Sequence, residues 1–326
     1  MPKVSVIVTI YNAGPYLRRC LDSLSSQTLT DVEFILVLDC PTDGSEKIAK
    51  NYADLDNRFI VVENKKNLHI GESRNVGILH AKGEYITFID HDDFCSLSML
   101  EILYQEACLN KADIVFSPLV EYYEERQEEV TKGAFIDKSM SVKECLLRQI
   151  VAQGSNEEKH SHYNQVHGVL YLLSTIKNSN VTFPNTRNTL PEDSLFNVSA
   201  LLNSRKVAYV NHGLYRHVTN VINTASNIAY YDIKKRINGF RILKEVLSKY
   251  ALFSEYKREY YMGIVRSMNC VILEHASCRR YFSVYEAIMY SKYDPDIRMA
   301  YKTFSDRGNN NKINLFNSVV EFLIKF

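Results

Sequence analysis

Four consecutive residues, Asp90-His91-Asp92-Asp93, form the clearest chemical motif of this sequence. They directly follow Tyr85–Ile89 (YITFI), an apolar run typical of a buried strand. Carboxylates crowded at a strand end repel one another unless a cation or a hydrogen-bond donor relieves them. Their hard oxygen atoms suit Mg²⁺ or Mn²⁺, and an ion held there would bridge the diphosphate of a nucleotide. The alternative is an acidic cluster that only caps the next helix.

Asp39 and Arg74 have side chains suited to binding a nucleotide. Asp39 follows the apolar run Val32–Leu38, and its carboxylate suits the N3–H of a uracil ring; alternatively, it makes an Asx turn. Arg74 lies where we expect a helix to begin, so its cation and the free backbone N–H groups suit a base edge or a phosphate. A surface salt bridge is the alternative for Arg74.

Glu192 and Asp193 open another predicted helix. Adjacent residues point in different directions, so one carboxylate can face a cleft as a general base while the other complements the helix dipole. Downstream, His212, Arg216 and His217 form a basic and polar group. This group either faces a diphosphate or an acceptor, or has ordinary surface and core roles.

Strands and helices alternate along the part of the chain that must position these residues. The apolar patterns predict strands at Val4–Ile10, Val32–Leu38, Phe59–Glu63, Tyr85–Ile89 and Ile114–Phe116. Helices are expected between them, at Leu17–Leu24, Glu46–Tyr52, Gly71–Ala81 and Met99–Asn110. This alternation indicates an α/β fold with a doubly wound, mainly parallel sheet. Ligands of such sheets bind beyond the carboxyl ends of the strands, where Asp39 and Asp90 are expected.

The C-terminal part of the chain has a different pattern. After about residue 226 it becomes helical and rich in Lys, Arg and Tyr. We therefore expect two parts: an α/β domain over residues 1–225, which carries the candidate site residues, and an α-helical appendage over residues 226–326. The tail Ile313–Phe326 has apolar residues at helical spacing. It either packs on the body or on a second subunit, or lies on a membrane surface.

Composition excludes several classes of function. The 326 residues include 39 Lys and Arg against 38 Asp and Glu, so no global field attracts nucleic acid. The seven cysteines are scattered without a CxxC pair, which argues against a disulfide framework and a zinc site. No apolar run approaches the roughly 20 residues of a transmembrane helix, and the N-terminus does not resemble a signal peptide. We expect a cytoplasmic protein, with peripheral contact at the inner face of the membrane left open.

Together these segments resemble the inverting family 2 glycosyltransferases, which have the GT-A fold of nucleotide-diphospho-sugar transferases. The resemblance covers roughly residues 3–216. It implies that the domain over residues 1–225 is the nucleotide-sugar-binding and catalytic domain. It rests on VSVIVTIYN at the first strand, VEFILVLDCPTDGS at the second, SRNVGILHAKGEYITFIDHDD up to the acidic cluster, and EDSLF at the later Glu-Asp pair. The chain departs from the family pattern after the second strand, where Leu38 replaces an aspartate and Cys40-Pro41 replaces Gly-Ser.

The resemblance implies a role for each candidate residue. The residues implied to bind the donor substrate are Thr9, Tyr11, Asp39, Arg74, Asp90 and Glu192. Within this set, Asp39 binds the base and Arg74 assists the base or the diphosphate. Asp92 is implied to ligate a divalent cation, Mn²⁺ or Mg²⁺, and Asp193 to be the catalytic base.

The implied reaction transfers a sugar from a nucleotide-diphospho-sugar, with a UDP-sugar as the expected donor, to an acceptor hydroxyl with inversion. We expect a glycan or lipid-linked acceptor, as in surface polysaccharide or glycoconjugate synthesis, and leave a homo-oligomer open. One alternative is a nucleotidyltransferase, for which TIYNAGPYLRR is a poor phosphate loop. The other is a non-catalytic nucleotide-sugar-binding protein, against which the intact Asp92 and Glu192-Asp193 argue.

Overall fold

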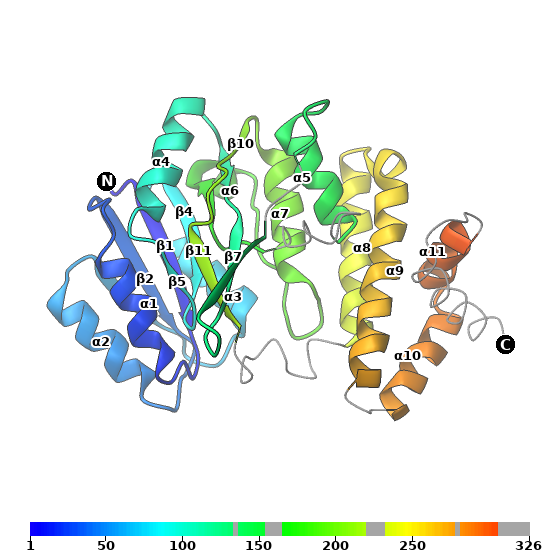
Figure 1. Ribbon diagram of the computed structural model, residues 1–326, viewed down its shortest axis with the longest axis horizontal. Helices are drawn as coiled ribbons and strands as arrows, with labels where there is room; N and C mark the ends of the chain where they lie inside the picture. The colour runs from blue at the N-terminus through cyan, green and yellow to red at the C-terminus, as the bar shows by residue number, and fades with distance from the viewer. Residues whose placement is uncertain (133–135, 154–164, 220–231, 278–280, 306–326) are drawn as a thin grey trace.

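The computed structural model describes residues 1–132, 136–153, 165–219, 232–277 and 281–305 (Figure 1). A central sheet with helices around it occupies one side of the molecule (Figure 1). The helices that follow residue 232 stand side by side on the other side (Figure 1).

The central sheet has seven strands in the order β10-β6-β9-β4-β1-β2-β3. Their bounds are β1 Val4–Ile10, β2 Val32–Leu38, β3 Phe59–Glu63, β4 Tyr85–Asp90, β6 Ile114–Phe116, β9 Val169–Leu172 and β10 Val207–Tyr209. All neighbours are parallel except β9, which runs antiparallel to β4 and β6. The predicted α/β fold with a mainly parallel sheet is therefore confirmed. β1 and β2 are buried along their whole length, which explains their continuous apolar runs.

A second sheet has four strands in the order β5-β11-β7-β8. Their bounds are β5 Phe94–Cys95, β7 Leu119–Tyr123, β8 Glu128–Lys132 and β11 Tyr215–Thr219. β5 directly follows the acidic cluster and pairs with β11, so that Tyr215 lies opposite Cys95. This pairing brings a strand from much later in the chain to the carboxylates.

Helices cover both faces of the central sheet. Their bounds are α1 Tyr16–Ser25, α2 Ser45–Leu55, α3 Ile70–His80, α4 Met99–Asn110, α5 Val142–Val151, α6 Leu173–Asn178 and α7 Glu192–Asn203. Apolar side chains of α1 and α4 belong to one core, and those of α3, α5 and α7 to another. Gly77 of α3 lies so close to β1 that a Cβ there would overlap the Ile7 side chain. This close approach brings Arg74, about one turn earlier, to the strand ends.

Four further helices confirm the predicted C-terminal appendage. Their bounds are α8 Ile233–Lys249, α9 Phe253–Ser277, α10 Tyr281–Tyr293 and α11 Pro295–Ser305. Phe240 of α8 and Tyr260 of α9 share a core with Phe88 of β4, so the appendage is packed onto the sheet's own core. Among the described helices, none combines the length and the apolar composition needed to cross a bilayer.

Two sequence predictions fall outside the described residues. One is the boundary between residues 225 and 226, which lies in the stretch 220–231. The other is the placement of the tail Ile313–Phe326. The division into domains 1–225 and 226–326 therefore stays a prediction.

Candidate active site

The carboxyl ends of β1, β2 and β4 bring four of the predicted site residues together. Thr9 of β1 is the register partner of Asp90 in β4, and Asp39 directly follows β2. Thr9 and Asp39 are buried, whereas Tyr11, just past the end of β1, is 47% exposed. An exposed aromatic ring at this edge of the sheet is available to a ligand.

The Asp39 carboxylate organises the loop after β3. Its Oδ1 accepts hydrogen bonds from Asn64 Nδ2 at 2.8 Å and from the backbone N–H of Leu68 at 2.7 Å. Its Oδ2 accepts one from the N–H of His69 at 2.9 Å. A carboxylate has about four lone-pair positions, so Asp39 keeps capacity to accept a hydrogen bond from a base. Since α3 begins directly after His69, Asp39 also ties β2 to the helix that carries Arg74.

The carboxylates of Asp90, Asp92 and Asp93 lie within 4.8 Å of one another, but their partners differ. Asp93 is fully buried and accepts a hydrogen bond from the Tyr215 hydroxyl. It also pairs with His217 Nδ1 at 3.2 Å. Burial opposes the charge of His217, but the hydrogen bond and charge of Asp93 outweigh burial and raise the pKa of His217 to about 9. Asp93 therefore anchors β11.

Asp90 and Asp92 face different surroundings. Asp90 Oδ1 accepts a hydrogen bond from Arg74 Nη2 at 3.0 Å, and Oδ2 lies 3.0 Å from His167 Nε2. Burial favours neutral Asp90, but His167 and Arg74 outweigh burial and hold the Asp90 pKa well below its usual range. No described residue gives Asp92 such a partner, and burial together with the charge of Asp93 raises the pKa of Asp92. A cation would relieve this cost, so Asp92 is the carboxylate that best fits a divalent ion.

Arg74 joins the acidic cluster to the start of α7. Its side chain is 2% exposed, and Nη1 donates to Asp193 Oδ1 at 2.5 Å while Nη2 donates to Asp90. Glu192 lies 4.0 Å from the same guanidinium. Burial opposes the charge of Arg74, but these three carboxylates outweigh burial and raise its pKa. The contact of Arg74 with a base or diphosphate stays a prediction, since here its guanidinium lies between carboxylates.

Glu192 and Asp193 begin α7, as predicted. Asp193 Oδ2 accepts a long hydrogen bond from the N–H of Val166 at 3.4 Å, so both of its oxygens are held. Burial, and then the charge of Asp193, raises the pKa of Glu192 to about 7. The carboxylate of Asp193 is thus held by the Arg74 guanidinium, and the adjacent carboxylate of Glu192 changes protonation near neutral pH. Such a pair is suited to proton transfer from an acceptor hydroxyl.

The structure adds His167 and Tyr215, which the sequence patterns did not single out. His167 precedes β9, is 8% exposed, and places Nε2 3.0 Å from Arg74 Nη2 as well as from Asp90. Its ring stacks on that of Tyr215, with centroids 5.2 Å apart and planes 18° apart. The Tyr215 hydroxyl bonds Asp93 and the backbone N–H of Asp90. His167 thus contacts the Asp90 carboxylate, and Tyr215 contacts the Asp93 carboxylate and the Asp90 backbone.

The basic and polar group separates in space. His217 lies against Asp93, as described above. Arg216, next to it in β11, pairs instead with Glu129 of β8 at 3.1 Å, which is the ordinary surface role. His212 is exposed before β11.

The family follows from a comparison of the whole chain. The sequence profile described as Glycosyl transferase family 2 matches residues 5–201, which include every residue to which the resemblance gives a role. The chain belongs to this family. An uncharacterized glycosyltransferase, EpsJ of Bacillus subtilis, is 32% identical over 260 residues, covering 78% of this chain and 71% of that protein. Transfer of a sugar is thus the general activity of the protein.

Solved structures support the GT-A fold. Residues 1–349 of Staphylococcus aureus TarS in complex with UDP align with a TM-score of 0.64 and 18% identity, over 99% of this chain and 88% of that one. A mannosyltransferase from Pyrobaculum calidifontis, in complex with GDP-Man and Mn²⁺, aligns with a TM-score of 0.54 and 14% identity, over 99% and 85%. At these identities the likeness concerns the fold.

Proposed function

We propose that the protein transfers a sugar from a UDP-sugar to an acceptor hydroxyl with inversion, using one divalent cation, Mn²⁺ or Mg²⁺. The observation that carries this proposal is the arrangement of two carboxylates. Asp92 stands without a partner among the described residues at the strand ends, and Asp193 stands at the start of α7, with Arg74 between them. The UDP and Mn²⁺ bound by the two proteins of like fold support the choice of donor and cation.

In the proposed mechanism, Asp92 would hold the cation, and Asp90, two residues earlier, would support it. When bound, the cation supplies positive charge against the diphosphate leaving group. Asp193 accepts the proton of the acceptor hydroxyl as that oxygen forms a bond to the anomeric carbon. The bond from the anomeric carbon to the diphosphate oxygen breaks on the opposite face, so a single displacement inverts the configuration. Thr9, Tyr11 and Asp39 border the nucleoside in this scheme.

A glycan or lipid-linked acceptor, used in surface polysaccharide or glycoconjugate synthesis, completes the proposal. An acceptor on a lipid would require peripheral contact of a cytoplasmic protein with the inner face of the membrane. Domain 1–225 would carry the donor site, and the appendage 226–326 would border the acceptor side. The appendage reaches that side because Leu190, two residues before Glu192, donates its N–H to the Lys235 carbonyl of α8 at 3.1 Å.

A thermal-shift screen tests the donor and the cation together. UDP with Mn²⁺ should raise Tm by a few degrees, since a ligand at about a hundred times its Kd adds about 2.7 kcal/mol of stability. UDP without metal should give a smaller shift, and GDP and CDP with Mn²⁺, which keep the ribose diphosphate, serve as controls for the base. Equal shifts for all three nucleotides would contradict UDP specificity. No shift with any nucleotide would contradict the donor site itself.

His167 provides a second test, because its Nε2 contacts both Arg74 and Asp90. His167→Leu should lower kcat by about 10- to 100-fold, the usual effect of losing a residue that orients a ligand from behind, with KM for the donor little changed. His167→Gln should restore most of the loss, since a glutamine amide reaches the position of Nε2, whereas His167→Asn reaches only that of Nδ1. Steady-state kinetics of the three variants measures kcat and the KM for the donor. Equal activity of the Leu and Gln variants would show that His167 acts only by packing.

A further inference from the structure

His69 has a backbone conformation that suits glycine better than histidine. It directly precedes α3, with a φ of 68° and a ψ of 169°, a region essentially confined to glycine because a Cβ crowds the backbone there. Both of its backbone polar groups hold it in place. The N–H donates to Asp39 Oδ2 at 2.9 Å, and the carbonyl accepts a hydrogen bond from the N–H of Ser73 at 3.0 Å. The fold therefore requires this backbone conformation, and glycine would adopt it without strain.

Two other residues with positive φ follow neighbouring strands, but their side chains bond the protein. Asn12, after β1, has a φ of 47°, and its Oδ1 accepts a hydrogen bond from the N–H of Thr42 at 2.8 Å. Cys40, after β2, has a φ of 58°, and its thiol donates to the carbonyl of Asn64 at 3.4 Å. The His69 imidazole is exposed and makes no hydrogen bond or ion pair within the described part of the chain. Strained residues cluster at ligand sites, so a histidine here indicates a contact with a ligand.

We propose that the His69 imidazole donates a hydrogen bond to the O4 carbonyl of the uracil ring of the donor and thereby helps to select uracil. This contact rests on the proposed function, in which Asp39 accepts the uracil N3–H. Because His69 donates its backbone N–H to Asp39, a base bound at that carboxylate lies beside the histidine. Cytosine carries an amino group where uracil has O4, so the same imidazole N–H would meet a donor.

The order of the strands favours O4 over O2, the other carbonyl oxygen beside N3. In the central sheet, β4 and β3 lie on opposite sides of the pair β1 and β2. Asp92 follows β4, so the diphosphate and the ribose would lie toward that strand, while His69 follows β3. In uracil, O2 is on the carbon bonded to the nitrogen that carries the ribose, and O4 is on the far side of N3. O4 is therefore the acceptor nearer to the loop after β3.

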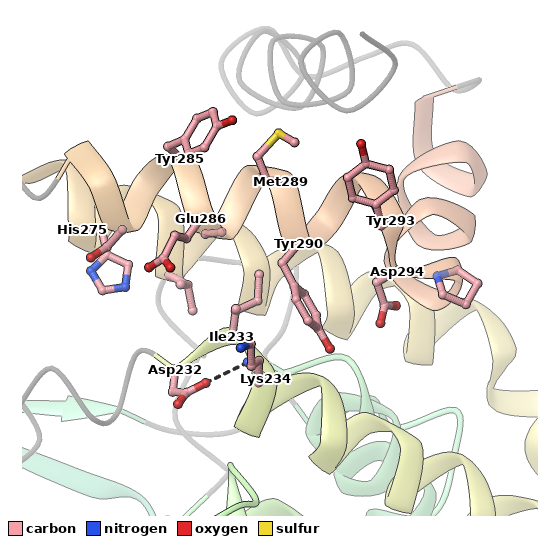
Figure 2. A pocket seen from close by; sticks show the side chains of 14 residues that line it. Asp232, Ile233, Lys234, His275, Tyr285, Glu286, Met289, Tyr290, Tyr293 and Asp294 are labelled. Atoms are coloured by element: carbon pink, nitrogen blue, oxygen red, sulfur yellow. Dashed lines mark hydrogen bonds between the residues drawn. The ribbon is translucent and has the colours of Figure 1, made fainter.

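A hollow between α8, α9 and α10 is the competing place for a nucleotide. It measures about 810 Å³ (Figure 2). Of the described residues that line it, three are carboxylates, Asp232, Glu286 and Asp294, and one is a lysine, Lys234. The carboxylates would repel the diphosphate of a nucleotide. The strand ends, where Asp92 fits a cation, are therefore the better place for UDP.

Two substitutions separate the imidazole from the backbone strain. His69→Ala removes the imidazole and keeps the Cβ, whereas His69→Gly removes both. Calorimetric titration with UDP and Mn²⁺ should show a Kd about three- to tenfold higher for both variants, as expected for one lost hydrogen bond. The Tm of His69→Gly should exceed that of His69→Ala by about 1–3 °C, because glycine adopts this conformation without strain. The matched control is His80→Ala, which removes an exposed histidine from the last turn of the same helix and should leave the Kd unchanged.

Titration with 4-thio-UDP tests the proposed contact with O4. Sulfur is a weaker acceptor than oxygen, so the wild type should bind 4-thio-UDP about three- to tenfold more weakly than UDP. His69→Ala should bind the two nucleotides with equal affinity. Any effect of the larger sulfur atom on the pocket is common to both proteins, so the difference between them measures the contact of His69.

The outcomes separate this contact from the proposed function. No UDP binding by the wild type would contradict the proposed function itself. If the wild type binds UDP and both His69 variants bind it equally well, the function stands and the contact is wrong. A UDP affinity lost in His69→Ala but restored in His69→Gly would show that backbone strain alone is responsible. Discrimination against 4-thio-UDP that persists in His69→Ala would assign O4 to another residue.

Discussion

Asp193→Asn should lower kcat for sugar transfer by about a hundred- to ten-thousandfold, the range that a positioned general base contributes, while nucleotide binding persists. The asparagine keeps nearly the same shape and can still accept the hydrogen bond that Arg74 donates to Asp193 Oδ1 at 2.5 Å. It cannot take a proton from the acceptor. Single-turnover kinetics with a radiolabelled donor, together with calorimetric titration of UDP, separates these two effects.

Glu192→Gln is the matched control for this prediction. It removes one carboxylate from the adjacent position of the same helix, and we expect it to alter KM more than kcat, with a loss in kcat within about tenfold. The charge of Asp193 contributes to the raised pKa of Glu192, which is about 7. Asp193→Asn should therefore lower the pKa of Glu192. If Glu192→Gln loses more turnover than Asp193→Asn, the base is Glu192.

The strand-end residues could be predicted because parallel strands point their carboxyl ends to one edge. Asp39 and Asp90 follow continuous apolar runs, and those runs became β2 and β4 as expected. The short antiparallel β9, with four residues, carries no periodic pattern long enough to identify. His167 depends on that strand, and its contact Arg74 is 93 positions away in the sequence.

Residue types alone do not assign the individual roles of the carboxylates in the acidic cluster. Asp90, Asp92 and Asp93 are chemically alike, and their spacing does not reveal which of them is free. β11 decides this, because it brings Tyr215 and His217 to Asp93. Arg74 was predicted at a helix start facing a nucleotide, but its carboxylate partner Asp193 comes from a helix 119 residues further along. Long-range packing therefore assigns the individual roles.

Asp92→Ala should remove the Mn²⁺ dependence of UDP binding and lower kcat by at least about a hundredfold, as expected when charge stabilisation of a leaving group is lost. Binding of UDP without metal should not weaken, because the contacts of Asp39 do not involve Asp92 and the loss of a carboxylate removes repulsion from the diphosphate. Calorimetric titrations with and without Mn²⁺ measure both quantities. An Asp92→Ala protein that still binds UDP more tightly with Mn²⁺ would place the cation elsewhere.

The same substitution should also stabilise the metal-free protein at alkaline pH. Burial, and then the charge of Asp93, raises the pKa of Asp92 above its usual value, so the ionised carboxylate opposes folding. This destabilisation is absent at acidic pH, where Asp92 is protonated in both states, and grows as pH rises through the raised pKa. The Tm of metal-free Asp92→Ala should therefore exceed that of the wild type at pH 8 and approach it at low pH. Asp93→Asn is the opposite case, because Asp93 anchors Tyr215 and His217, and it should lower Tm. A carboxylate that destabilises the fold unless a cation binds it is the pattern expected of a residue kept for function.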